Sequence, residues 1–198
     1  MTNVSSKKSG RDILIGVDEA GRGPLAGPVV AAAVYLKTFR FSCRIDDSKK
    51  LTRKERDEAF LELGLKSVFG VGIINEAVID RVNILAATQL AMERAIRDLM
   101  AKMGDVPARR VQLLVDGTVR LNVKMPVEHI IEGDGKSKSI ASASIVAKTV
   151  RDRIMEVYDT VFPLYGFRKH KGYPTEAHRR ALAKHGSSRI HRKTFAGV

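Results

Sequence analysis

The sequence has one cysteine and no long apolar segment. Among its 198 residues only Cys43 is a cysteine, so the chain cannot close an internal disulfide, and we expect a protein of the reducing cytoplasm. No apolar run approaches the roughly 20 residues that a bilayer span needs. The opening segment MTNVSSKKSGRD has no hydrophobic stretch behind its lysines. These absences predict that the chain is neither exported nor inserted into a membrane.

Acidic residues are also scarce relative to basic ones. Asp and Glu total 22 against 35 Lys and Arg, which gives a net charge of +13. An excess of this size favours a polyanionic partner, most commonly a nucleic acid. Hydrophobic residues make up 44% and charged residues 29% of the chain, as in an ordinary globular protein rather than a disordered or collagen-like one. We expect a flexible basic tail over residues 1–11 and a single domain over residues 12–198.

Five short segments rich in Val, Ile or Leu, each ended by Gly, Asn or an acid, are typical of β-strands. They cover residues 13–17, 29–36, 67–74, 111–115 and 127–131. Helical spacing of apolar residues, with start and stop signals, predicts four helices. They cover residues 52–63, 84–103, 139–161 and 175–185. The alternation predicts one α/β domain with a central mixed five-stranded sheet flanked by helices.

Individual residues predict where the first helix begins and which side chains of two others face the core. Thr52 and Glu55 have the spacing of a capping box, which marks the start of the first helix. The apolar stripe of the helix over residues 84–103 includes Leu85, and that of the helix over residues 139–161 includes Val157 and Val161. Such a stripe predicts that these side chains face a core.

Carboxylates follow three of the expected strands. They are Asp18 and Glu19 after ILIGV, Asp116 after QLLV, and Asp134 after VEHIIEG. In open α/β sheets, sites are usually built at the strand ends. Carboxylates held together repel one another unless a cation neutralises them, and Mg²⁺ and Mn²⁺ prefer carboxylate and water oxygens. Two such ions can clamp the attacking and leaving oxygens of a phosphodiester, so these acids on a basic protein predict a metal-dependent nuclease.

Each acid also has a plainer structural interpretation. Asp116 with the following glycine is a common turn signal, and an acid before a helix, like Asp134, is often solvated or caps the helix. The pair formed by Asp18 and Glu19 has no obvious structural duty, because it stands in a glycine-rich link after a buried strand. Four acids arranged in this way favour a site, although the sequence does not place them together in space.

Two phosphate-binding loops fit the sequence poorly. GRGPLAG has its glycines in the spacing GxGxxxG, and Asp18 and Glu19 beside it would repel the pyrophosphate of a dinucleotide. The segment GKS over residues 135–137 lacks the first glycine of an ATPase loop, because Ile130 stands at that position. The sequence therefore disfavours both a Rossmann enzyme and an ATPase.

The C-terminal part of the chain carries most of the basic excess. Residues 166–198 hold nine Lys or Arg and one acid, Glu176, and so contribute +8 of the net +13. Four histidines lie there too, but no cysteine accompanies them and their spacing matches no zinc pattern. A helical basic region over about residues 163–198 that follows nucleic-acid phosphates is the better interpretation. A basic binding module without catalysis is the rival hypothesis, and it leaves the strand-end acids unexplained.

Six segments resemble motifs of one enzyme family. GVDEAGRGPLAGPVVAAAV is similar to the signature of the bacterial type 2 ribonucleases H, the ribonuclease HII family. The later motifs, in the family's order, are DDSKKL (46–51), LLVDG (113–117), EGDGKSKSIASASIVAKTVRDR (132–153), FPLYGFRKHKGYPT (162–175) and HRKTF (191–195). Together they cover nearly all of the chain after residue 11. We expect no additional N-terminal domain of the kind found in ribonuclease HIII.

The resemblance implies an RNase H-like fold and an endonuclease that hydrolyses the RNA strand of RNA/DNA hybrids. It also implies cutting 5′ of single ribonucleotides embedded in duplex DNA, a reaction of ribonucleotide excision repair, with 3′-hydroxyl and 5′-phosphate ends. It marks as catalytic acids and ligands of two Mn²⁺ or Mg²⁺ ions the four residues Asp18, Glu19, Asp116 and Asp134, which the strand pattern also selects. A monomer is the default, and a sliding clamp as a protein partner is left open.

An RNA-selective nuclease must detect the 2′-hydroxyl. The tripeptide Gly21, Arg22 and Gly23 suits that task, because glycines let backbone donors and acceptors approach a sugar closely. The resemblance implies that this tripeptide contacts the ribonucleotide and that Tyr173 stacks on the neighbouring sugar. The alternative for Tyr173 is a half-buried tyrosine at a proline turn. Lys49 in DSKKL is expected to face the scissile phosphate, and its plainer interpretation is a solvated loop lysine.

Overall fold

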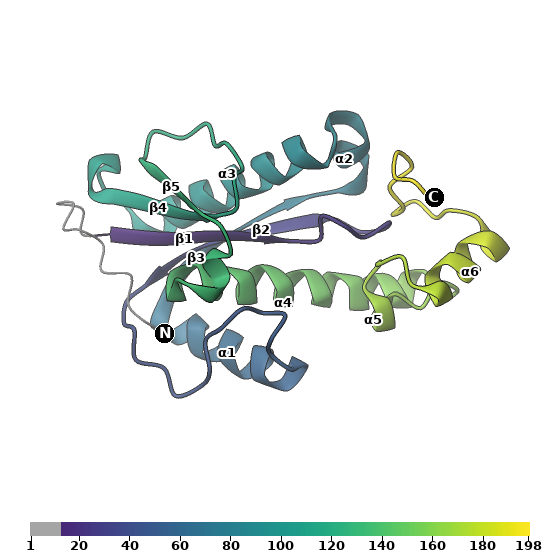
Figure 1. The fold of residues 1–198 in the computed structure, drawn as a ribbon, viewed down its shortest axis with the longest axis horizontal. Helices are drawn as coiled ribbons and strands as arrows, with labels where there is room; N and C mark the ends of the chain where they lie inside the picture. Colours follow the sequence, from purple (N-terminus) through teal and green to yellow (C-terminus); the bar gives the residue numbers. More distant parts are fainter. Residues whose placement is uncertain (1–12) are drawn as a thin grey trace.

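A mixed sheet of five strands forms the centre of the molecule in the computed structural model, which describes residues 13–198 (Figure 1). The expected tail over residues 1–11 lies outside this range. The strands are β1 (Ile13–Ala20), β2 (Val29–Leu36), β3 (Ser67–Ile74), β4 (Val111–Asp116) and β5 (Val127–Ile130). Their order in the sheet is β3-β2-β1-β4-β5. β1 pairs antiparallel with β2, as does β2 with β3, whereas β1 with β4 and β4 with β5 are parallel.

Helices cover both faces of this sheet (Figure 1). They are α1 (Arg53–Lys66), α2 (Glu76–Val82), α3 (Ile84–Met103), α4 (Lys138–Val161), α5 (Phe167–His170) and α6 (Glu176–His185), with short 3-10 helices η1 (Ala108–Arg110) and η2 (Gly133–Gly135). One buried cluster joins β1, β2 and β4 to α2 and α3. A second joins β2 to α1 and α4. The predicted α/β class with a mixed five-stranded sheet is confirmed.

Local chemistry explains why two of the helices lie where they do. α1 begins with the predicted capping box: Thr52 Oγ1 accepts from the Glu55 N–H, and the Glu55 carboxylate accepts from the Thr52 N–H. α4 approaches β1 very closely at Gly16, where any Cβ would overlap the backbone of Ser139. The absence of a side chain at Gly16 therefore lets the start of α4 lie directly beneath the strand that carries the first acids.

Three predicted core positions are wrong. Leu85 is 59% exposed, Val157 61% and Val161 60%. Leu85 lies in the first turn of α3, and the last fully buried residue of α4 is Met155. Near its end α4 packs against other parts of the chain through Met155 and Tyr158, and Val157 and Val161 lie outside this contact face. Among residues 13–198, no helix combines the length and apolarity that a bilayer crossing requires.

The C-terminal segment packs against the link between β1 and β2. A third buried cluster joins Leu25 and Ala26 of that link to Met155 of α4 and to apolar residues beyond α4. The cluster includes Phe167 of α5 and Leu182 of α6. In Figure 1, α5, α6 and the C-terminus accordingly gather at one end of the molecule. The Leu25 N–H also donates to the Gly172 carbonyl at 2.8 Å. The fold thus brings the glycine-rich link against the KGYPT motif, residues 171–175, although the two are far apart in the sequence.

Candidate active site

Parallel pairing of β1 and β4 brings the first two aspartates together. Val17 lies opposite Val115 in the register, so the next residues, Asp18 and Asp116, are neighbours. Asp116 is the last residue of β4, but β1 continues to Ala20, so Asp18 and Glu19 lie within the strand and not after it as expected. β5 continues into η2, which carries Asp134, and the Gly133 N–H donates to Asp116 Oδ1 at 2.7 Å. One carboxylate oxygen from each of Asp18, Asp116 and Asp134 lies within 4.8 Å of the others. Three of the four predicted acids therefore converge.

Burial and mutual repulsion make these carboxylates costly to hold as free anions. Asp18 is 4% exposed, and its pKa is raised well above the usual value by burial first and then by the negative charges of Glu19 and Asp116. A hydrogen bond from Ser144 of α4 opposes this rise. The pKa of Asp134 is raised by burial and then by Asp47 and Asp116. A bound cation would relieve both penalties.

The donor chemistry of this cluster fits a hard divalent cation. All three groups offer carboxylate oxygens from separate backbone segments, which is the ligand type that Mg²⁺ and Mn²⁺ prefer. Among residues 13–198, no other group of three or more acids, histidines or cysteines has its ligand atoms this close together.

Glu19 lies outside this set of three. Its Oε1 is 3.4 Å from Arg22 Nη1, so the acid pairs with the glycine-rich tripeptide. Burial raises the pKa of Glu19, and the positive charge of Arg22 opposes that rise. The negative charge of Asp116 also raises this pKa, and the Glu19 backbone N–H donates to Asp18 Oδ1 at 2.7 Å. Glu19 thus links the carboxylates to the tripeptide.

Lys49 stands at the border of the cluster. Its Nζ lies 3.8 Å from Asp134 Oδ2, while 80% of its side chain is exposed. Burial lowers the pKa of Lys49, but the negative charges of Asp134 and Asp47 outweigh that effect and raise it. Arg56 Nη1 donates to the carbonyl oxygens of Ser48 and Leu51, which fixes the loop on both sides of Lys49. The lysine is therefore held near the acids with its ammonium group accessible to a ligand.

Two buried arginines shape the glycine-rich link. Arg192 Nη2 donates to the Gly21 carbonyl at 2.6 Å, and its Nη1 donates to the Arg22 carbonyl at 2.9 Å. Arg151 Nε donates to the Pro28 carbonyl at 2.9 Å. Gly21 has φ +99°, and a Cβ there would overlap Arg151. The arginines thus fix the backbone of a tripeptide whose first position requires glycine.

Tyr173 lies beside this tripeptide. A Cβ built on Gly23 would be 3.9 Å from Tyr173 Cε1, and the ring is 42% exposed. The guanidinium carbon of Arg151 lies 5.9 Å and Lys148 Nζ 6.0 Å from the centre of the ring. These cations hold an accessible aromatic face next to the tripeptide.

Several residues of this site have no role that the sequence predicts. Arg151, Arg192 and Ser144 lie in the segments TVRDR, HRKTF and SASI, but nothing in their spacing indicates which backbone groups they bind. Arg192 does not belong to the phosphate-binding surface that the sequence predicts. Its side chain is fully buried, so its charge serves the tripeptide and not the surface. Seven of the nine basic residues in the C-terminal segment are exposed: Arg168, Lys169, Arg179, Arg180, Lys184, Arg189 and Lys193.

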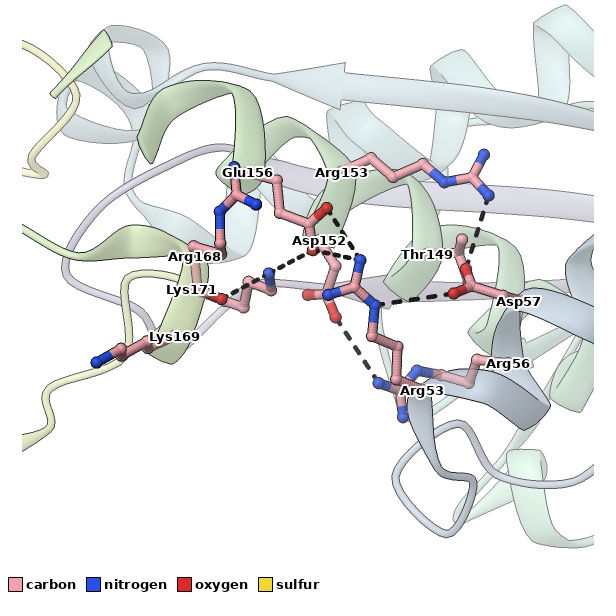
Figure 2. A pocket seen from close by; sticks show the side chains of 10 residues that line it. All are labelled: Arg53, Arg56, Asp57, Thr149, Asp152, Arg153, Glu156, Arg168, Lys169 and Lys171. Atoms are coloured by element: carbon pink, nitrogen blue, oxygen red, sulfur yellow. Dashed lines mark hydrogen bonds and ion pairs between the residues drawn. The ribbon is translucent and has the colours of Figure 1, made fainter. Parts of the chain in front are cut away.

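A separate hollow of about 390 Å³ lies between α1, α4 and α5 (Figure 2). Glu156 of α4 pairs with Arg53 of α1 at 3.0 Å and with Lys171, which follows α5, at 2.8 Å. Arg153 of α4 pairs with Asp57 of α1 at 3.6 Å. Figure 2 shows these pairs running across the wall of the hollow. The network ties the segment that leads into Tyr173 to two long helices.

Comparison with known proteins agrees with this geometry. The family model described as ribonuclease HII matches residues 15–198. The ribonuclease HII of Geotalea daltonii is 52% identical over 186 residues, covering 93% of this chain and 83% of its own. Ribonuclease H2 from Pyrococcus horikoshii OT3 has a TM-score of 0.67 at 22% identity, covering 93% of this chain and 94% of its own. Bst-RNase HIII, in a crystal structure with Mn²⁺, has a TM-score of 0.72 at 18% identity, covering 93% of this chain and 67% of its own.

Proposed function

This chain belongs to the ribonuclease HII family and is a type 2 ribonuclease H, an endonuclease, and from that premise we propose its substrate and mechanism. We propose that it hydrolyses the RNA strand of RNA/DNA hybrids and cuts 5′ of single ribonucleotides embedded in duplex DNA. The products would carry 3′-hydroxyl and 5′-phosphate ends.

One observation carries this proposal. The cluster of Asp18, Asp116 and Asp134 is joined through Glu19 to a tripeptide whose backbone is fixed beside an exposed tyrosine. The cluster suits phosphodiester hydrolysis, and the tripeptide with Tyr173 suits recognition of a ribose. Their adjacency supports cleavage at a ribonucleotide.

Asp18, Asp116 and Asp134 are proposed to hold two divalent ions, Mn²⁺ or Mg²⁺, and Glu19 to complete the set of ligands. When bound, such ions lower the pKa of an attacking water and stabilise the charge that develops on the departing 3′-oxygen. The alternative role proposed for Asp134 is to orient the attacking water, and its Oδ2 lies 3.8 Å from Lys49 Nζ.

The remaining residues bind and orient the substrate. The carbonyl groups of Gly21 and Arg22 accept from the buried Arg192, which keeps the tripeptide in place. The other backbone groups of Gly21, Arg22 and Gly23 are proposed to bond to a 2′-hydroxyl. Tyr173 offers its exposed face for stacking on the neighbouring sugar. Lys49 holds an ammonium group where it can contact the scissile phosphate.

The test is to map the cut in DNA duplexes that contain one or four consecutive ribonucleotides, with Mg²⁺ and with Mn²⁺. We expect cleavage 5′ of the single ribonucleotide and none in an all-DNA duplex. A duplex with a 2′-O-methyl ribonucleotide is the matched control, because the methyl group removes the hydroxyl's ability to donate. A protein that shifts these duplexes in a gel without shortening them would be a binding module, contrary to the proposal.

A further inference from the structure

Histidines that are far apart in the sequence meet beneath the KGYPT turn. His178 of α6 and His191 are both almost fully buried, at 0% and 1% exposure. Their Nε2 atoms are 3.0 Å apart. The ring of His170 from α5 stacks on that of His178, with centroids 4.4 Å apart. The fold thus gathers two buried imidazoles and one half-buried imidazole that the proposed chemistry does not use.

The hydrogen bonds around His178 and His191 determine which nitrogen of each ring carries the proton. The Ser188 N–H donates to His191 Nδ1 at 2.9 Å, so that nitrogen is an acceptor and the ring proton of neutral His191 is on Nε2. His191 Nε2–H then donates to His178 Nε2. The proton of His178 is consequently on Nδ1, which donates to the Tyr173 carbonyl at 3.0 Å. Ser188 Oγ lies 2.8 Å from the same His191 Nδ1, so its hydroxyl is a second donor to that nitrogen. Every ring nitrogen of the pair therefore has a partner when both rings are neutral.

The same turn is held from its other side. The Tyr173 N–H donates to the His170 carbonyl at 2.9 Å, and the Gly172 N–H donates to His170 Nδ1 at 3.2 Å. His170 Nε2 is then the donor to the Tyr165 carbonyl at 2.8 Å. Histidines therefore bond the backbone on both sides of the residue whose ring lies beside Gly23.

We propose that His178 and His191 are positioning residues for substrate recognition, a neutral hydrogen-bonded pair that fixes the backbone of Tyr173 so that its ring stays against the glycine-rich tripeptide. The inference rests on the proposed role of Tyr173 in the function above. Burial lowers the pKa of His191 to about 4 and also lowers that of His178, which agrees with two uncharged rings at neutral pH.

The residue after His191 gives the pair a second connection to the site. Arg192 donates to the carbonyls of Gly21 and Arg22. One short segment, residues 188–192, therefore positions the tripeptide through the arginine and the tyrosine through the histidines. Displacement of this segment would alter both sides of the proposed ribose site together.

The test is a double-mutant cycle between His178 and Tyr173, measured as kcat/KM on a duplex with one embedded ribonucleotide. We expect His178→Phe, which removes both ring nitrogens, to lower kcat/KM about tenfold in the native background and less than about twofold in the Tyr173→Ala background. His178→Asn keeps a donor near the Nδ1 position and should recover most of the activity. His185→Asn, on an exposed position of the same helix, is the matched control and should remain within about twofold of the native protein.

An equal loss in both backgrounds, or a His178→Asn variant as impaired as His178→Phe, would overturn the positioning role. A Tyr173→Ala variant with native kcat/KM would instead contradict the proposed function of Tyr173 itself. If His178→Phe fails to fold, ¹⁵N NMR of the native protein's imidazoles decides the matter. The proposal expects two neutral rings at pH 7 with protons on His178 Nδ1 and His191 Nε2, and the opposite tautomers or a charged ring would refute it.

Discussion

At the scale of single residues, the site is built at the expense of stability. Asp18 combines burial with two acidic neighbours, so its charge opposes folding at neutral pH. A carboxyl group whose pKa is raised on folding favours the folded state only when it is protonated. Its contribution to the free energy of unfolding is therefore lost as the pH rises through that raised pKa. A side chain with this cost and no packing purpose is the signature of a functional group.

Replacing Asp18 by Asn should stabilise the metal-free protein. The amide removes the charge but retains an oxygen that can accept from the Glu19 N–H, as Asp18 Oδ1 does at 2.7 Å. In EDTA at pH 7 we expect the melting temperature of Asp18→Asn to rise by about 3 °C or more, the shift that about 1 kcal/mol gives in a domain of this size. Differential scanning calorimetry measures this, with Asp105→Asn at an exposed position as the control.

Addition of Mn²⁺ should raise the melting temperature of the native protein, because an ion that binds only the folded state stabilises it. The same addition should change Asp18→Asn little. A variant that melts lower than the native protein in EDTA, or that keeps the full Mn²⁺ response, would contradict the assignment of Asp18 to an ion site.

Gly21 and Gly23 should respond differently to a methyl group. Gly21→Ala places a Cβ against Arg151 at a positive φ, so we expect a loss of about 2 kcal/mol or more in the free energy of unfolding. Gly23→Ala places a Cβ at an ordinary contact distance from Tyr173, so it should fold normally. It should nevertheless raise KM several-fold by narrowing the space for the sugar. Urea unfolding and steady-state kinetics on the same two proteins separate the effects, and a Gly23→Ala variant with native KM would argue against ribose binding there.

At the scale of elements, periodicity predicted long segments better than short ones. The strands over residues 29–36 and 67–74 and the helix over residues 84–103 have the predicted bounds. α2 and α5 were not predicted, because one or two helical turns give too few apolar repeats to show a period. α2 ends at Val82, and the next residue, Asn83, has φ 69° and caps α3. The two helices therefore meet without the glycine or proline that usually marks a break.

The C-terminal elements should lose stability in mild acid because of the buried histidines. The pKa of His191 is lowered from 6.5 to about 4 by burial and by the neighbouring His178 and His170. The unfolded chain therefore binds more protons than the folded one between these values, so the free energy of unfolding falls as the pH drops from 6.5 towards 4 and is unaffected above 6.5. His178 shifts in the same direction.

Comparison with His191→Gln isolates this effect from the titration of the carboxylates. We expect the free-energy difference between the native protein and His191→Gln, measured by urea unfolding, to shrink as the pH is lowered from 7 to 5. A difference that stays constant over this range would show that His191 is not held neutral by the fold.

At the scale of the whole molecule, the clustered acids and the exposed basic residues lie in different regions. Acids gather in a largely buried cluster where β1, β4 and η2 meet, while most basic residues of the C-terminal segment remain exposed. Resemblance and strand pattern together predicted the four acids, the tripeptide and Tyr173, and the parallel register explains why Asp18 and Asp116 meet. The burial of Arg151 and Arg192 could not be predicted, because a buried guanidinium is defined by carbonyl groups that only the folded chain assembles.

Substrate binding should depend steeply on salt if the exposed C-terminal cations contact phosphates. Each neutralised phosphate contributes about −0.9 to the slope of log K against log salt. We expect a variant that combines Arg179→Gln, Lys184→Gln and Arg189→Gln to reduce the slope by about one unit for each side chain that makes such a contact. Fluorescence anisotropy with a hybrid duplex between 50 and 300 mM KCl measures the slopes, and an unchanged slope would show that these charges are only solvated.

Single-turnover cleavage by Asp116→Asn, with binding of the same hybrid measured in parallel, tests whether the clustered carboxylates carry out the reaction. The amide oxygen of this variant could still accept from the Gly133 N–H, as Asp116 Oδ1 does at 2.7 Å, so the fold and the affinity for hybrid should remain within about twofold. Cleavage should fall at least about a thousandfold, because one of the three clustered carboxylates is lost. Cleavage that persists in this variant, or in the native protein in excess EDTA, would contradict a mechanism that depends on carboxylate-bound divalent ions.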